Sequence, residues 1–208
     1  MKILNLYAGI GGNRKLWNDV MPGATITAIE KDIKIAAVYQ ELNQNDEVII
    51  GDAHKYLLDN HSNFDFIWSS PPCQSHSKMM KATRHKLNKY PDMSLYQEII
   101  FLQNFFKGKW IVENVKPYYK PLIKPTKEIG RHLFWSNFNL DEIEEIKSPG
   151  NFINKGNKQG VEDLKKWLGL EYQGNLYYEN NHCPGQVLRN CVHPLIGKQI
   201  LNESIKGI

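Results

Sequence analysis

Short apolar runs alternate with amphipathic segments through the first half of the chain. The apolar runs are rich in β-branched and aromatic residues, and each is followed by glycine or polar residues, as buried strands are. Apolar residues at helical spacing fill most of the intervals between these runs. Repeated strand–helix units predict an α/β fold with a mostly parallel, Rossmann-like sheet. The predicted strands cover residues 3–7, 24–29, 48–50, 64–68 and 110–112, and the predicted helices cover residues 13–20, 33–42 and 95–106.

The second half of the chain has a less regular pattern. Residues 131–138 have the aromatic content of a further strand, residues 161–168 have the spacing of an amphipathic helix, and residues 194–205 predict a terminal helix. Mixed charge and Pro149 predict a loop-rich stretch at residues 139–159. We therefore expect one α/β domain with a small loop-rich appendage.

The overall composition is ordinary for a globular protein. Of the 208 residues, 41% are hydrophobic and 23% are charged, which fits one domain. The apolar runs are far too short to span a bilayer, and the first residues begin a strand-like run without a basic segment, so we expect no signal peptide. Three cysteines without a Cys-x-x-Cys pair argue against a disulfide framework. We expect a cytoplasmic protein without a membrane partner.

The positive charge is concentrated in one stretch of the chain. The formal net charge of +4 indicates little by itself, but no acidic residue occurs between Asp65 and Asp92. Most isolated basic runs are solvated helix faces, whereas a stretch of one sign next to a reactive site attracts a polyanion. The position of this stretch, directly after the cysteine discussed below, favours the second interpretation. Its basic side chains are Lys78, Lys81, Arg84, Lys86 and Lys89, with His76 and His85 among them.

A glycine turn and two acids stand where the first three predicted strands end. The turn runs from Tyr7 to Gly12 as Tyr-Ala-Gly-Ile-Gly-Gly, and we expect it to open a helix whose free N–H groups attract a carboxylate or phosphate. Glu30 is placed to accept hydrogen bonds from ribose hydroxyls, and Asp52 from an adenine amine. Each acid alone is more often a solvated loop residue, but the three features together favour a nucleoside ligand.

The spacing of the glycines narrows the class of ligand. The turn lacks the third glycine of the dinucleotide fingerprint, and no Gly-Lys-Ser/Thr follows it as in a P-loop. A single nucleoside with a carboxylate tail fits better, and S-adenosylmethionine is such a molecule.

The segment Ser-Pro-Pro-Cys-Gln at residues 70–74 is the most informative in the chain. Two prolines stiffen the backbone and cannot continue a central strand, so we expect Cys73 on a rigid turn at the rim of the sheet. Most free cysteines are small buried hydrophobic residues, but the adjacent basic stretch predicts a thiolate nucleophile here. Glu113 ends the fifth predicted strand, so we expect its carboxyl group to reach the same crevice as an acid or hydrogen-bond donor.

Taken together, these motifs resemble those of the DNA cytosine-5 methyltransferases. The glycine turn is similar to the family's Phe-x-Gly-x-Gly-Gly cofactor loop, with Tyr7 in place of phenylalanine. Pro-Cys-Gln at residues 72–74 resembles the nucleophile motif, and Glu-Asn-Val at residues 113–115 resembles the second catalytic motif. Asn-Cys-Val at residues 190–192 is similar to a late motif that returns to the cofactor pocket. The resemblance covers residues 1–137 and resumes at about 186–205.

The resemblance implies a reaction and a set of site residues. Cys73 would attack carbon 6 of a cytosine that has left the DNA stack, Glu113 would bind ring nitrogen 3 and the exocyclic amine, and Arg131 would hold the ring carbonyl. S-adenosylmethionine would donate the methyl group. The expected cofactor-binding residues are Tyr7, Gly9, Ile10, Gly11, Gly12, Glu30, Lys31, Asp52, Ala53, Leu95, Asn190 and Cys191. The expected DNA-binding residues are Gln74, Lys78, Lys81, Arg84 and Lys86.

The chain departs from the family pattern in three places. Where the family has Arg-x-Arg before an aromatic strand, this chain has Arg131 and His132, so either side chain can meet the cytosine carbonyl. Arg189 stands where a glycine is usual. The region available for target recognition is very short, so we expect a short recognition site or a helper protein, and the oligomeric state stays open. The expected division is a catalytic domain at 1–137, a reduced recognition region at 138–187 and a returning segment at 188–208.

Four alternatives compete with this interpretation. An amino methyltransferase would carry an aromatic residue where Cys73 stands, and a non-catalytic DNA-binding module would not require Cys73 and Glu113 together. An RNA substrate stays open. A zinc site built from His182, Cys183, Cys191 and His193 lacks the usual ligand spacings, so we expect no metal.

Overall fold

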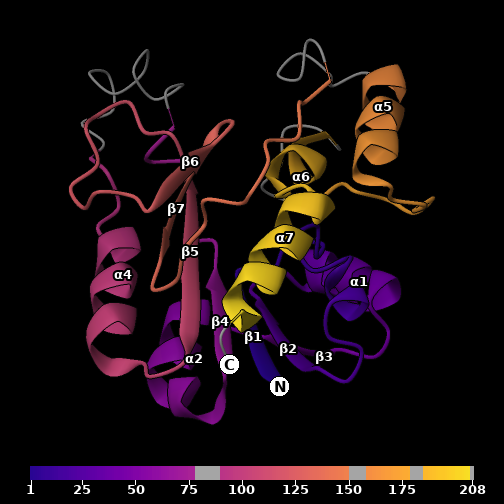
Figure 1. Ribbon diagram of the computed structural model, residues 1–208. Helices are drawn as coiled ribbons and strands as arrows, with labels where there is room; N and C mark the ends of the chain where they lie inside the picture. Colours follow the sequence, from indigo (N-terminus) through magenta and orange to yellow (C-terminus); the bar gives the residue numbers. More distant parts are fainter. Residues whose placement is uncertain (78–89, 150–157, 179–184, 207–208) are drawn as a thin grey trace.

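The computed structural model describes residues 1–77, 90–149, 158–178 and 185–206. Its centre is a seven-stranded sheet in the order β3-β2-β1-β4-β5-β7-β6. The first five strands in sequence run parallel to one another, whereas β7 is antiparallel to both β5 and β6. The α/β fold with a mostly parallel sheet is therefore confirmed (Figure 1). The strands are β1 (Lys2–Leu6), β2 (Thr25–Glu30), β3 (Glu47–Ile50), β4 (Phe66–Ser69), β5 (Lys109–Val115), β6 (Lys127–Ile129) and β7 (His132–Ser136).

Helices of eight to twelve residues accompany the sheet, together with one shorter helix near the C-terminus. Residues 33–42 and 194–205 form helices with the predicted bounds, and the predicted helices at 95–106 and 161–168 are also present with slightly different ends. Two helices were not predicted, one after β3 and one just before residue 191. The helices are α1 (Ile33–Leu42), α2 (Ala53–Asn60), α4 (Ser94–Phe105), α5 (Lys158–Leu168), α6 (Gly185–Asn190) and α7 (Pro194–Ile205).

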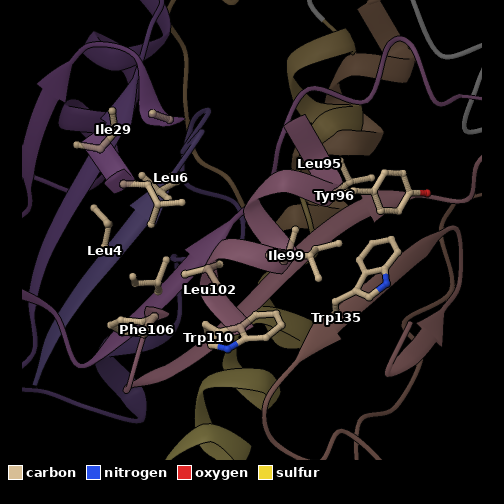
Figure 2. Close-up of a cluster of buried hydrophobic side chains, with 14 of the residues drawn as sticks. Leu4, Leu6, Ile29, Leu95, Tyr96, Ile99, Leu102, Phe106, Trp110 and Trp135 are labelled. Atoms are coloured by element: carbon tan, nitrogen blue, oxygen red, sulfur yellow. The ribbon is translucent and has the colours of Figure 1, made fainter. Parts of the chain in front are cut away.

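Both faces of the sheet are covered by apolar side chains, which explains why the strand sequences are almost continuously hydrophobic. Alternate residues of β1 point to opposite faces, so Leu4 and Leu6 pack with α2 and α4, whereas Ile3 packs with α7. Figure 2 shows the first of these clusters, in which side chains of α4 such as Ile99 and Leu102 lie over the strands. The result is a three-layered domain in which the strand ends are held rigidly.

The predicted helix at residues 13–20 is wrong. The chain makes successive turns there, followed by one short 3-10 helix (Trp17–Asp19). The buried Arg14 guanidinium binds both carboxylate oxygens of Asp46, at 2.5 and 2.6 Å, and the Trp17 indole donates to the carbonyl of Gly197 at 3.2 Å. These tertiary contacts hold the segment in turns instead of the helix that its apolar spacing predicts. The free energy of the buried contacts outweighs the small intrinsic helix propensity of the segment.

The segments 158–178 and 185–191 pack on the α1 side of the molecule. Side chains of α5, of the segment 170–178 and of α6 form one apolar cluster with Ile10 and Val38. The last helix, α7, packs beside the 3-10 helix on the sheet face of β1. In the described part of the chain, no helix is both long and apolar enough to cross a membrane.

Candidate active site

The strand ends bring the candidate residues together. All five parallel strands finish at one edge of the sheet, and the register places the ends of β1, β2, β4 and β5 side by side. The residues at these ends are Tyr7, Glu30, Ser70 and Glu113. In open α/β sheets this edge, where the strand order reverses, is where ligands bind.

The loop that carries Cys73 is clamped to the strand that carries Glu113. The buried amide of Asn114 donates to the carbonyl of Pro71 at 3.0 Å. The carbonyl of Cys73 accepts from the backbone N–H groups of His76 and Ser77, both at 3.0 Å, which turns the chain directly after the cysteine. The predicted rigid turn is therefore present. Cys73 itself is partly exposed.

The electrostatic surroundings of Cys73 differ from the prediction. Burial raises the pKa of the Cys73 thiol, and the nearby Glu113 raises it further, whereas Arg131 lowers it. The net direction is upward, opposite to the direction that the adjacent basic stretch predicted. The basic residues that motivated the prediction, from Lys78 onward, lie outside the described residues.

Glu113 is buried within β5, and its carboxylate meets a histidine from the neighbouring strand. Nδ1 of His132 lies 2.5 Å from Oε1 of Glu113, and both side chains are at most a tenth exposed. The antiparallel pairing of β5 and β7 places them diagonally on one face of the sheet. The guanidinium of Arg131 also lies close enough to Glu113 to interact with it electrostatically.

Arg131 lies beside the same two groups. Its guanidinium donates to the carbonyl of Arg189, and it interacts electrostatically with Glu113, Cys73 and Cys191. Burial lowers the pKa of Arg131, and these neighbours raise it. The position immediately before β7 thus brings a half-buried guanidinium to the cysteine and the glutamate. The sequence predicted this convergence, and the structure brings Cys73, Glu113 and Arg131 together.

The cofactor end begins with Glu30 at the end of β2. Its Oε2 accepts from the backbone N–H of Gly9 at 3.0 Å, and its Oε1 accepts from the N–H groups of Lys31 and Asp32 at 2.8 and 2.9 Å. The carboxylate is thus held firmly between the glycine turn and the start of α1. The side chain of Lys31 is exposed beside it.

The glycines of the turn serve two different purposes. Gly9 has a left-handed φ of 55°, and a Cβ atom there would meet nothing within 4 Å, so the backbone faces open space. At Gly12 a Cβ atom would lie 2.5 Å from Cβ of Cys191. The segment at residues 190–192 therefore does return to the turn, as predicted. Asn190 is exposed there, Cys191 is buried, and Ile10 anchors the turn in the apolar cluster of α1.

Asp52 is the N-cap residue of α2. Its Oδ1 accepts from the backbone N–H of Lys55 at 2.9 Å, and the side chain is exposed. Ala53 occupies the first helical position, where the backbone N–H has no partner within the helix. The exposed carboxylate of Asp52 can accept from an adenine amine, and the adjacent backbone N–H of Ala53 can donate to a ring nitrogen.

Glu98 is a buried carboxylate that the sequence did not single out. Both of its oxygens are used: Oε1 accepts from the hydroxyl of Tyr7 at 2.5 Å and lies 3.1 Å from Nδ1 of His54, and Oε2 accepts from Ser69 at 2.5 Å. Leu95, a predicted cofactor residue, is buried one turn earlier on α4. Glu98 thus ties together the ends of β1 and β4 and the start of α2. An acid at an apolar position of a helical pattern is the signal that would have identified it.

The predicted DNA contacts are only partly within the described structure. Gln74 is exposed next to Cys73. Lys78, Lys81, Arg84 and Lys86 lie outside the described residues. The chain just before them is fixed, since Nδ1 of the buried His76 lies 2.6 Å from the hydroxyl of Tyr119. Tyr119 belongs to a further acid-free stretch, residues 114–127, which carries exposed lysines and which the sequence analysis did not identify.

The residues at the cofactor end fit S-adenosylmethionine. Glu30 and Asp52 offer carboxylates to hydroxyl and amine groups, and the open backbone at Gly9 leaves room for a ligand to approach. No group of three or more histidine, cysteine, aspartate or glutamate side chains suitable for a metal occurs in the described ranges. Cys191 and His193 have structural roles there: Cys191 packs on Gly12, and His193 caps α7.

Comparison with solved structures shows the fold. A methyltransferase of Entamoeba histolytica, EhMeth, is 11% identical with a TM-score of 0.58, and the match covers 98% of this chain and 97% of that one. An S-adenosylmethionine-dependent methyltransferase from Agrobacterium tumefaciens matches over 57% of this chain and 40% of its own, at 15% identity and a TM-score of 0.42. Comparison with curated proteins gave no significant match.

Comparison with family models identifies the chain. The model for C-5 cytosine-specific DNA methylases matches residues 1–134, which include the glycine turn, the Cys73 loop, Glu113 and Arg131. The match spans more than half of the chain. The protein therefore belongs to the C-5 cytosine-specific DNA methylase family and is an S-adenosylmethionine-dependent DNA cytosine-5 methyltransferase.

Proposed function

We propose that the protein methylates carbon 5 of cytosine through a covalent bond between the Cys73 sulfur and carbon 6 of the ring. The observation that carries this proposal is the clamp between Asn114 and Pro71, which holds the cysteine loop against the strand of Glu113. A nucleophile and an acid on one rigid support can act on two atoms of one small ring at the same time. A flexible loop would lose this advantage.

The chemistry follows from the groups present. The Cys73 thiolate forms a bond to carbon 6, and the ring double bond supplies the electron pair that makes carbon 5 nucleophilic. Glu113 donates a proton to ring nitrogen 3, and Arg131 offers hydrogen bonds to the ring carbonyl, so the adduct does not accumulate negative charge. Bound S-adenosylmethionine supplies the methyl group that carbon 5 takes. Carbon 5 then loses its proton to a base, the bond to sulfur breaks, and the proton on nitrogen 3 returns to Glu113.

The cofactor end positions the donor for this step. Glu30 would accept hydrogen bonds from the ribose hydroxyls, and Asp52 with the backbone of Ala53 would bind adenine. The glycine turn from Gly9 to Gly12, with Ile10 as its anchor and Cys191 behind it, would face the methionine portion. The lining of the cofactor pocket would be completed by Tyr7, Leu95 and Asn190.

DNA binding is proposed to rest mainly on phosphate contacts. A target base must leave the stack to reach Cys73, and the basic stretch from Lys78 to Lys86, with Gln74, would contact the strand around it. Within residues 138–187, the segment 138–146 packs in the cluster of β1 and α7, and the segment 164–178 packs with α1, which supports a reduced recognition region. Each bidentate base contact contributes roughly 1–3 kcal/mol of discrimination, so few contacts give a short site of about two to four bases or require a helper protein.

Trapping tests the covalent step. A random-sequence duplex that contains 5-fluoro-2′-deoxycytidine should become covalently attached to the protein in the presence of S-adenosylmethionine, because fluorine at carbon 5 cannot leave as a proton does. Cys73→Ser should abolish the adduct, and Cys183→Ser is the matched cysteine control and should retain it. A full-strength adduct with Cys73→Ser would overturn the assignment.

The nucleic acid itself is tested in parallel. An RNA of the same sequence that carries 5-fluorocytidine should give no adduct. Trapping of the RNA alone would keep the role of Cys73 but overturn DNA as the substrate.

A further inference from the structure

The contact between His132 and Glu113 influences which carboxyl oxygen of Glu113 carries the proton. A carboxyl group that binds cytosine must do two things at once: donate to ring nitrogen 3, which is an acceptor, and accept from the exocyclic amine, which is a donor. Only the protonated carboxylic acid offers one donor and one acceptor. Which oxygen is the hydroxyl and which is the carbonyl therefore decides whether the acid is correctly oriented.

His132 lies on one of the two oxygens. Its Nδ1 is 2.5 Å from Oε1 of Glu113. An N–H that donates to Oε1 stabilises that oxygen as the acceptor, so the acid proton resides on Oε2. The carbonyl oxygen has two lone pairs, so Oε1 can still accept from the cytosine amine. The imidazole thus fixes the acid in the orientation that the base requires.

We propose that His132 is a positioning residue that sets the proton of Glu113 on the oxygen facing ring nitrogen 3. This proposal rests on the proposed role of Glu113 in the reaction. His132 does not touch the cytosine, and Arg131 remains the side chain for the ring carbonyl. After the proton has passed from Oε2 to ring nitrogen 3, the N–H of His132 and the guanidinium of Arg131 hold the carboxylate that is left, until the proton returns.

The placement of the pair supports a specific role over simple packing. His132 is the first residue of β7 and pairs in register with Val115, the last residue of β5, so both backbones are fixed by the sheet. Both side chains are also buried. The contact between Nδ1 of His132 and Oε1 of Glu113 is already present in the structure without substrate, so it is available before the substrate arrives. Preorganisation of this kind is what makes hydrogen bonds effective in catalysis.

Two substitutions separate positioning from folding. His132→Asn keeps an N–H donor near the place of Nδ1, whereas His132→Leu removes it. We expect turnover of the Leu variant to fall by about 100-fold, as for a misplaced catalytic group, and that of the Asn variant by less than about tenfold. The dissociation constant for S-adenosylmethionine, measured by calorimetry, should be unchanged in both, which also shows that both variants are folded.

A double-mutant cycle shows whether His132 acts through Glu113. In a Glu113→Gln background, His132→Leu should cost little more, because the group that it orients no longer exists. An equal cost in both backgrounds would overturn the proposal. Equal turnover of the Leu variant and the unaltered protein would overturn it as well.

A spectroscopic measurement keeps the proposal independent of activity. Nitrogen-15 NMR of labelled imidazole should show Nδ1 of His132 protonated, with its proton at unusually low field. The signal should vanish in His132→Asn and move to higher field in Glu113→Gln. An unprotonated Nδ1 would overturn this proposal and leave the covalent role of Cys73 intact, whereas failed trapping by a protein with the expected NMR signal would overturn only the reaction.

Discussion

The buried glutamates at the two ends of the site, Glu98 and Glu113, are bound in different ways. Glu98, at the cofactor end, has hydrogen-bond partners on both oxygens, and these come from three different elements. Glu113, at the catalytic end, has His132 on one oxygen. A buried carboxylate is stable only when it is well satisfied, so Glu98 has the surroundings of a structural link. Glu113 has ionisable neighbours at the catalytic end instead, namely His132, Arg131 and Cys73.

This difference suggests how one edge of a sheet can be both rigid and reactive. Glu98, whose two carboxylate oxygens both have hydrogen-bond partners, links the glycine turn, the start of α2 and the end of β4. It therefore helps to set the shape of the cofactor end. The carboxylate of Glu113 lies beside Cys73 and Arg131, where the proposed reaction takes place. Substitutions at the two positions should therefore affect different quantities.

The largest effect is expected at Glu113. Glu113→Gln should lower turnover by roughly 100-fold or more, because the amide has no proton to transfer to ring nitrogen 3. The free energy of unfolding and the affinity for S-adenosylmethionine should change little, since the amide oxygen can still accept from His132. Single-turnover methylation and calorimetry measure the two quantities. Loss of cofactor binding with retained turnover of the bound enzyme would assign Glu113 to the cofactor end.

The opposite outcome is expected at Glu98. Glu98→Leu leaves the hydroxyls of Tyr7 and Ser69 without their acceptor, and each such buried donor costs about 1–3 kcal/mol. The midpoint of denaturant unfolding should fall clearly, and cofactor binding should weaken with it. Glu142→Leu, at an exposed site, is the control and should leave the midpoint nearly unchanged. An unaltered midpoint for Glu98→Leu would show that the link is dispensable.

The surroundings of Glu30 are intermediate between those of Glu98 and Glu113. Backbone N–H groups bind its carboxylate, which still faces the open side of the glycine turn. Glu30→Ala should weaken S-adenosylmethionine binding by about 10- to 100-fold, which corresponds to about 1.5–3 kcal/mol for hydrogen bonds to a charged group. Calorimetry with S-adenosylhomocysteine tests this without turnover. An unchanged dissociation constant would reject the ribose assignment.

The pH dependence of adduct formation examines the catalytic end alone. Burial and Glu113 raise the pKa of Cys73. Only the thiolate attacks, and the thiol is protonated below its pKa, so the rate of trapping at low DNA concentration should rise about tenfold per pH unit until the pKa is reached. A rate that is already constant at and below neutral pH would show that the cysteine is ionised in the free protein.

The smallest effect is expected for Tyr7→Phe. The ring stays and only its hydroxyl is lost, so stability should fall by about 1 kcal/mol, the usual net contribution of one hydrogen bond. Glu98 keeps Ser69 and His54 as partners in this variant. Thermal unfolding at fixed pH measures the change, and a loss as large as that of Glu98→Leu would mean that the tyrosine carries the link by itself.

The sequence predicted the elements that depend on local signals. α1 follows Asp32, whose side chain caps it, and α7 follows His193 with proline at its first position, so both have strong start signals and both bounds agree with the prediction. The segment at residues 13–20 has apolar spacing but lacks such a cap. There the pairing of Arg14 with Asp46 outweighs the local preference.

The sequence by itself determined the identity of the site. Cys73 after two prolines, Glu113 at a strand end and the glycine turn are recognisable because their chemistry depends on residue type and order along the chain. What the tertiary structure alone decided is how these groups are partnered: the raised pKa of Cys73, the link through Glu98 and the contact of His132 with Glu113. The reason is physical, since burial and hydrogen bonding depend on which distant segments meet, and a one-dimensional pattern does not contain those distances.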